Sequence, residues 1–222
     1  MKIEQAYLNF LNLVNRNLTN NNVNVDKPRF VLMFNDMQLR YEDYLLEQKF
    51  DESIRECSHL LVDKTLTLKS ESDNKNLYNL PSDYFDLSNL FVKANNEECK
   101  EIDFETYEVK PENVQELLKN ENFKPSFEYR ETFYLTSGES TVSVFKDNFE
   151  IQSVDILYYK KPKEVDIEGY TKLNETASTS IDPEWSDFSI NRILLAMSKE
   201  FAAINSDGNQ YNLSKDRLFQ PI

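Results

Sequence analysis

The residue types that most often carry enzyme chemistry are scarce in this sequence. It contains a single histidine, His59, and two cysteines, Cys57 and Cys99. A cysteine nucleophile activated by histidine requires the two side chains to meet, whereas residues two apart on a helix point in different directions. We therefore expect His59 to lie at the surface or at the edge of a core. Structural zinc sites use about four cysteine or histidine ligands, so we expect no metal site.

Nucleotide chemistry also lacks the residues it needs. The three glycines, Gly138, Gly169 and Gly208, are far apart, so neither a P-loop nor a dinucleotide-binding fingerprint can be formed. We expect no cofactor and no catalytic residue. Trp185 stands before an apolar helical pattern, where we expect it to pack that helix onto the core; stacking on a sugar or base is the alternative.

Carboxylates are abundant but no spacing singles out a pair. A solvated face is the first interpretation of the acidic run between residues 97 and 121. An acidic lining, or a docking surface for a basic partner, is the second. The run consists of Glu97, Glu98, Glu101, Asp103, Glu105, Glu108, Glu112, Glu116 and Glu121.

The composition predicts a folded acidic protein. Fifteen phenylalanines and twelve tyrosines are too many for a disordered chain. The formal net charge of −14 opposes binding to DNA, because neutralising phosphates requires clustered lysine and arginine. No apolar run approaches the ~18 residues of a membrane span, and the start, MKIEQAYLNF, does not have the pattern of a signal peptide. We expect a water-soluble protein from a reducing compartment.

The periodicity of apolar residues predicts helices at both ends of the chain and strands between them. Residues 2–19 and 28–61 read as helices, the second with a break near residues 50–51, and Asp182 reads as the cap of a helix that continues to about residue 204 with Phe188 on its buried side. A short helix is expected at residues 111–120. Strands are expected at residues 63–70, 86–94, 99–109, 126–135, 140–146 and 149–159. Residues 77–85 read as a short strand followed by a turn that begins at a proline.

This order predicts an α+β fold without alternating βαβ units. We expect N-terminal helices (residues 1–62) to pack with a loop and a late helix (residues 161–205). A β-rich insertion (residues 63–160) separates them, and a C-terminal tail (residues 206–222) follows.

Three landmarks give the chain a resemblance to a known class of protein. LPSDYFDL follows the N-terminal helices, ILYYKKPKEVDIEGY closes the β-rich middle, and IDPEWSDFSINRILLAMSKEFAA forms the last helix. In this order they resemble the head-to-tail connector (adaptor or ring) proteins of tailed bacteriophages, above all the ring protein of crAss-like phages. The resemblance extends from the first helix to about residue 205.

The resemblance implies a virion structural protein of the neck, assembled in the host cytoplasm and without enzymatic activity. Such proteins form a homo-oligomeric ring, as a rule a dodecamer, below the portal protein. Further ring or tail proteins follow, and genomic DNA passes through the channel without specific binding. No membrane is involved. The tail is implied to clasp the portal, with the apolar anchors Tyr211, Leu213, Leu218 and Phe219.

A basic cluster lies inside this acidic chain. Lys160, Lys161 and Lys163 surround a proline and follow Tyr158. A solvated strand end is one interpretation, since Pro162 has no N–H group to continue a strand ladder. The other interpretation makes Tyr158 and the three lysines a subunit interface, where a positive patch attracts an acidic neighbour.

Two other functions are compatible with the sequence. A carboxylate-based hydrolase or carbohydrate-active module would place two converging acids about 5–10 Å apart in a pocket of the β-rich middle. An adaptor of unrelated origin would bind a basic partner through residues 97–121.

Overall fold

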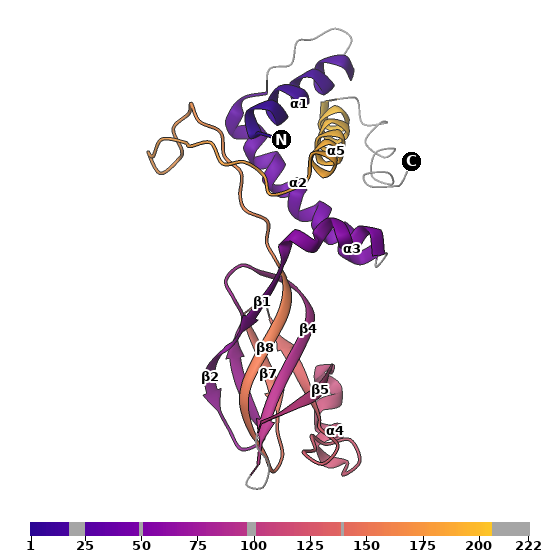
Figure 1. Cartoon of the computed structure of the whole chain (residues 1–222). Helices are drawn as coiled ribbons and strands as arrows, with labels where there is room; N and C mark the ends of the chain where they lie inside the picture. The colour runs from indigo at the N-terminus through magenta and orange to yellow at the C-terminus, as the bar shows by residue number, and fades with distance from the viewer. Residues whose placement is uncertain (18–24, 49–50, 97–100, 139, 206–222) are drawn as a thin grey trace. The chain divides into compact units, whose positions relative to one another are not determined.

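The chain is an α+β protein whose two compact units each fold around their own core. The computed structural model describes residues 1–17, 25–48, 51–96, 101–138 and 140–205. Residues 1–59 and 162–222 belong to one unit, here called the helical unit, and residues 60–161 form the other, the sheet unit. The sheet unit is therefore an insertion into the helical unit's sequence (Figure 1).

Phenylalanines join the helices of the helical unit. The ring of Phe10 lies 5.5 Å from that of Phe30 and 6.1 Å from that of Phe201. All three side chains are buried, so each of the three long helices contributes an aromatic ring to one core. The helical segments are α1 (Ile3–Asn17), α2 (Lys27–Gln48), α3 (Asp51–Cys57), the 3₁₀ turn η1 (Ser58–Leu60) and α5 (Asp187–Asn205).

Capping residues fix where two helices begin. Asp26 accepts a hydrogen bond from the backbone N–H of Arg29 at 3.1 Å, which confirms the expected start of α2. The predicted start of the last helix is wrong. Helix α5 begins at Asp187, and Ser186 is its cap, because the Ser186 hydroxyl accepts the Ser189 N–H at 3.1 Å.

Asp182 has a different role from the one expected. Its carboxylate accepts the backbone N–H of Ile3 at 2.9 Å and so satisfies a donor at the start of α1. The five residues before α5 instead carry Trp185 into the core, where it is 3 % exposed. Phe188, expected on the buried side, is 62 % exposed. It lies nine residues before the buried Met197, which at about 100° per residue puts the two side chains on opposite faces of the helix.

Replacing Ser186 by alanine is expected to lower the free energy of unfolding of the helical unit by about 1 kcal/mol. The substitution removes the acceptor of the Ser189 N–H. Denaturant unfolding followed by the fluorescence of Trp185, the single tryptophan, measures the change. Thr171→Ala, which removes an exposed hydroxyl from the same unit, is the control; equal losses in both variants would refute the cap.

Eight strands form one mixed sheet that curls on itself. Their order across the sheet is β1-β8-β4-β5-β6-β7-β3-β2, and all neighbours are antiparallel except β5 and β6 (Figure 1). The concave side holds a buried apolar cluster that includes Leu90, Phe104 and Ile156. The strands are β1 (Leu61–Thr65), β2 (Thr67–Glu71), β3 (Lys75–Asn79), β4 (Tyr84–Asn95), β5 (Ile102–Glu108), β6 (Glu131–Ser137), β7 (Thr141–Phe145) and β8 (Glu150–Lys160).

The two edge strands are consecutive in the chain. Only Leu66 separates β1 from β2, so the single strand expected at residues 63–70 is in fact two. Leu66 is buried, and its N–H donates to the carbonyl of Val154 at 2.8 Å. Before Leu66 the chain pairs with β8 as strand β1, and after Leu66 it pairs with β3 as strand β2. One continuous segment therefore supplies both ends of the curled sheet.

A short helix covers part of the convex side. The 3₁₀ turn η2 (Pro111–Asn113) leads into α4 (Val114–Lys119), as the sequence predicts for residues 111–120. Val114 packs with Phe133 and Phe145 there. Strand β6 begins five residues later than expected, because residues 126–130 form a turn that closes between Ser126 and Glu131 and includes Arg130 at φ 56°.

Candidate functional site

The segment between the sheet unit and α5 forms an ordered strap, defined here as residues 162–186. Antiparallel bridges join Asp166 to Ile181 and Thr171 to Ala177, so the strap folds back as an irregular hairpin. Gly169 has φ +104°, a conformation that favours glycine, and a Cβ there would lie 3.0 Å from the Nζ of Lys27. That ammonium donates to the Glu168 carbonyl at 2.7 Å and ties the strap to the start of α2.

Amide side chains of α2 hold the strap at its other end. Asn35 accepts the N–H of Val165 at 2.9 Å and donates to the carbonyl of the same residue at 3.1 Å. Gln38, one turn later, donates to the Lys163 carbonyl at 3.1 Å. The Asn35 side chain thus pairs with both the N–H and the carbonyl of Val165, as the backbone of a neighbouring strand would.

Asp166 organises the hairpin from the inside. Its carboxylate is buried and accepts the Tyr170 hydroxyl at 2.7 Å, the Ile167 N–H at 2.9 Å and the Thr179 N–H at 3.3 Å. The Lys172 ammonium lies 2.7 Å away. Burial by itself raises the pKa of Asp166, but these hydrogen bonds favour the carboxylate and leave the pKa below its usual value. Burial and the same hydrogen bond raise the pKa of Tyr170 to about 12.

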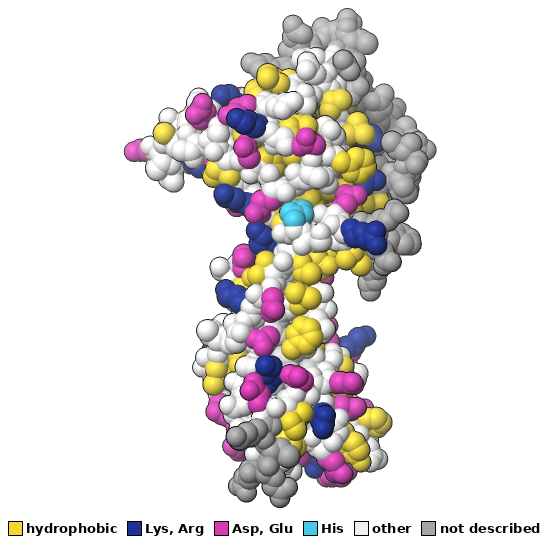
Figure 2. Space-filling model, viewed as in Figure 1, with side chains coloured by type: hydrophobic (Ala, Val, Ile, Leu, Met, Phe, Trp, Pro, Cys, Tyr) yellow, Lys and Arg dark blue, Asp and Glu magenta, His cyan; other side chains and the backbone are white. Residues whose placement is uncertain are grey.

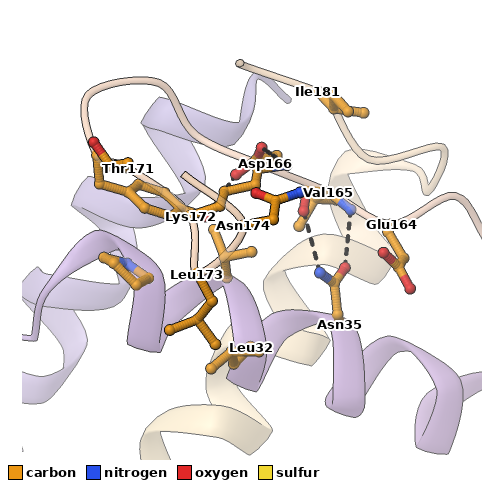
Figure 3. A pocket seen from close by; sticks show the side chains of 13 residues that line it. Leu32, Asn35, Glu164, Val165, Asp166, Thr171, Lys172, Leu173, Asn174 and Ile181 are labelled. Atoms are coloured by element: carbon orange, nitrogen blue, oxygen red, sulfur yellow. Dashed lines mark hydrogen bonds and ion pairs between the residues drawn. The ribbon is translucent and has the colours of Figure 1, made fainter. Parts of the chain in front are cut away.

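An open apolar groove of about 610 Å³ lies between α2 and the strap (Figure 3). Pro28, Val31 and Leu32 line it from the helix, and Ile181 and Leu173 line it from the strap. Leu32 is 72 % exposed and Leu173, at the hairpin tip, is fully exposed. Apolar side chains that gather around a concavity indicate a binding surface.

The lining of the groove is better suited to binding an apolar protein surface than to acid–base catalysis. Its two carboxylates are Glu164 and Asp166, and Asp166 is already engaged by the hairpin. Figure 3 shows Glu164 on the opposite side of Val165 from Asp166, so the two acids do not converge. The groove therefore offers shape and apolar area rather than an acid–base pair.

The predicted subunit-interface residues separate into two groups. Tyr158 is 1 % exposed, and its hydroxyl donates to Asp83 at 3.0 Å, so it belongs to the sheet core and the expectation that it contacts a neighbour is wrong. Burial of the ring and the bond to Asp83 raise its pKa to about 12. Lys161 and Lys163 are exposed and Lys160 is half-buried. The boundary between the two units falls after Lys161, so the lysines do not form one patch on one unit.

The remaining predicted anchors cannot be placed. Tyr211, Leu213, Leu218 and Phe219 lie outside the described residues. Cys57 is buried, and burial raises the pKa of its thiol to about 12, which disfavours a thiolate nucleophile. His59 is exposed, with its ring 5.0 Å from that of Trp185 in an edge-to-face arrangement.

A shallow hollow on the sheet unit contains several acids. Asp63, Asp103 and Asp155 line it beside Phe91 and Lys93. Asp155 accepts the hydroxyl of Thr65 from the adjacent strand. Within the described ranges, no group of three or more histidine, cysteine or acidic side chains is placed to hold a metal ion. The hollow thus places three aspartates and two lysines, Lys64 and Lys93, around the exposed ring of Phe91.

Sequence reasoning did not find the groove. Asn35 and Asp166 have no distinctive neighbours in the sequence, and their roles arise when residues about 130 positions apart meet. The available signal was the pair Leu32 and Leu39, which fall outside the buried stripe of α2. Apolar residues on the polar face of an amphipathic helix indicate a second contact.

None of the described helices has the length and apolarity needed to cross a membrane. A scan with protein-family models finds no family that matches the chain, and a search of curated proteins finds no similar sequence.

Proposed function

We propose that this protein is a virion structural protein that forms a ring below the portal of a tailed phage and continues the DNA channel toward the tail. The sequence landmarks that resemble connector proteins motivate the proposal. The observation that carries it is the groove of the helical unit, with Leu32 and Leu173 exposed beside it although the unit has a complete core of its own. Exposure of this apolar surface to water is unfavourable in free energy, and burial against a partner removes that penalty.

Further apolar side chains on the helical unit support contact with more than one neighbour. Leu8 on α1 is 58 % exposed and Phe188 on α5 is 62 % exposed. Figure 2 shows hydrophobic side chains scattered over the visible face of this unit. A ring built from one kind of subunit needs two unlike contact surfaces, because the front of each copy meets the back of the next.

The acidic charge supports passage of DNA without binding. Strand β5 and helix α4 present exposed carboxylates, and Glu105 on β5 is opposite Glu131 on β6. A channel lined by such groups repels phosphates, whereas a basic channel would release counterions and hold the DNA. A ring whose lumen is lined by lysine and arginine would refute this part of the proposal.

Assembly tests the proposal. The purified protein, alone and with the portal protein of the phage that the proposal implies, is examined by negative-stain electron microscopy and mass photometry. We expect rings, either free or attached to the portal. A chain that stays monomeric at all concentrations and does not bind the portal in pull-downs would overturn the proposal.

A further inference from the structure

The exposed faces of α2 and α5 carry matching patterns of opposite charge. Each pattern has an apolar residue, a charged residue, an apolar residue and a charged residue at positions i, i+4, i+7 and i+11. On a helix these positions lie on one face and span about 16 Å. The acidic stripe of α2 is Leu32, Asp36, Leu39 and Asp43, and the basic stripe of α5 is Phe188, Arg192, Leu195 and Lys199.

The apolar members of both stripes are accessible to a partner. Leu32 and Leu39 are 72 % and 37 % exposed, and Phe188 and Leu195 are 62 % and 37 % exposed. Leu32 also lines the groove beside the strap, so the acidic stripe has an apolar hollow at its first position. The guanidinium of Arg192 lies 5.1 Å from the centre of the Phe188 ring, which gives the basic stripe an aromatic–arginine pair of the kind common in binding hot spots.

The charges at the far ends of the stripes have no ion-pair partner among the described residues of the helical unit. Asp43 and Lys199 form no ion pair with any residue that the structure describes. The inner charges are already paired, Asp36 with Arg40 at 2.6 Å and Arg192 with Glu56 at 3.3 Å. Asp43 and Lys199 are therefore the charges most available to another molecule.

The two stripes do not satisfy each other in one copy. The opposite faces of the two helices are the buried ones, through Phe34 and Met37 on α2 and Met197 on α5. Where α2 meets α5, the flanking residues Arg40 and Glu200 bond at 3.4 Å. Both stripes thus lie on helix faces that are turned away from the common core.

We propose that the acidic stripe of one copy packs in parallel against the basic stripe of the next copy. This contact rests on the proposed ring and specifies its subunit interface. In the parallel alignment all four positions match: Leu32 with Phe188, Asp36 with Arg192, Leu39 with Leu195, and Asp43 with Lys199. An antiparallel alignment of the apolar residues pairs neither Asp43 nor Lys199 with an opposite charge. Because the stripes differ, the contact is head-to-tail and can close into a ring.

Cross-linking between copies tests the contact. The variant Asp43→Cys/Lys199→Cys, in a Cys99→Ser background, is treated with a short thiol-specific bifunctional reagent at concentrations where the chain oligomerises, with and without portal. Cys57 is buried with a raised thiol pKa and stays unreactive. We expect a ladder of covalent oligomers from the double variant, and none from either single cysteine variant.

Exchange of charges gives a second readout with an internal control. Asp43→Lys or Lys199→Glu alone places like charges together, and we expect association about tenfold weaker or more. The combined variant Asp43→Lys/Lys199→Glu restores the opposite pairing at every interface of a homo-oligomer and should restore assembly. Lys119→Glu, an exposed lysine on α4, makes the same charge change as Lys199→Glu and should leave association unchanged.

The outcomes separate this contact from the ring itself. Rings that form without the ladder, or that are indifferent to the charge exchange, overturn the stripe contact and leave the ring proposal intact. Dimers cross-linked through a single cysteine variant overturn it as well, because they show a symmetric contact. A chain that neither assembles nor binds the portal overturns the ring proposal and the stripe contact together.

Discussion

Replacing Phe10 by alanine is expected to lower the free energy of unfolding of the helical unit by about 3–5 kcal/mol. Phe10 is fully buried, and its ring contacts those of Phe30 on α2 and Phe201 on α5. The truncation leaves a cavity where three helices meet, and the rigid neighbouring rings cannot collapse into it.

The position of the single tryptophan allows the stability of the helical unit to be measured separately from that of the sheet unit. Trp185 lies in the helical unit, so its fluorescence during denaturant unfolding follows that unit. Amide hydrogen exchange of strands β4 and β8 follows the sheet unit, and we expect it to change little. Leu8→Ala on the same helix, at a side chain 58 % exposed, is the control and should lose less than about 1 kcal/mol. Equal losses at the two positions would contradict the described core.

Replacing Asp166 by asparagine is expected to destabilise the strap by about 1.5–3 kcal/mol, the range for hydrogen bonds to a charged group. The neutral amide keeps one acceptor oxygen for Ile167 and Tyr170. Its NH2 group cannot accept from the Thr179 N–H, and the loss of charge removes the ion pair with Lys172. Protection from hydrogen exchange at Thr179 and Ile181 measures the loss. Leu173→Ala, at the fully exposed tip of the same hairpin, is the control, and the prediction fails if the two variants exchange alike.

The same carboxylate predicts a dependence on pH with a defined sign. The pKa of Asp166 is lower in the folded protein than in the unfolded chain, so the carboxylate's contribution to stability is complete above the unfolded value of about 3.9. That contribution is lost as the pH falls from there through the folded pKa. Wild type and Asp166→Asn should therefore differ in stability at neutral pH and converge in acid. A difference that persists at the lowest pH would contradict this role.

Local signals in the sequence were sufficient for most elements of the fold. Apolar spacing predicts α2, and alternation predicts the strands of the insertion. The errors arose where a long-range contact took precedence over a local signal. Asp182 has the sequence of a helix cap, yet it caps α1 from 179 residues away. Leu66 reads as part of one strand, but its burial and its bond to Val154 divide that strand.

The candidate site was less predictable than the fold for the same reason. The lysine-rich segment contrasts in charge with the rest of the chain, but Tyr158 within it is a core residue. The groove depends on Asn35 meeting Val165, which no local pattern reveals. The stripes of α2 and α5 were in principle readable, since they are spacings within single helices, but their exposure had to be known first.

The sheet unit leaves the helical unit's sequence and returns to it through hydrogen-bonded neighbours. Leu61 at the start of β1 is the partner of Tyr159 near the end of β8, and Cα atoms of such antiparallel partners lie about 4.5–5.5 Å apart. A gap this short can be bridged by one or two residues. The helical unit therefore does not need the insertion to bring its own two halves together. A chain in which a one- or two-residue linker replaces the sheet unit is therefore expected to keep the helices that carry the two stripes in place.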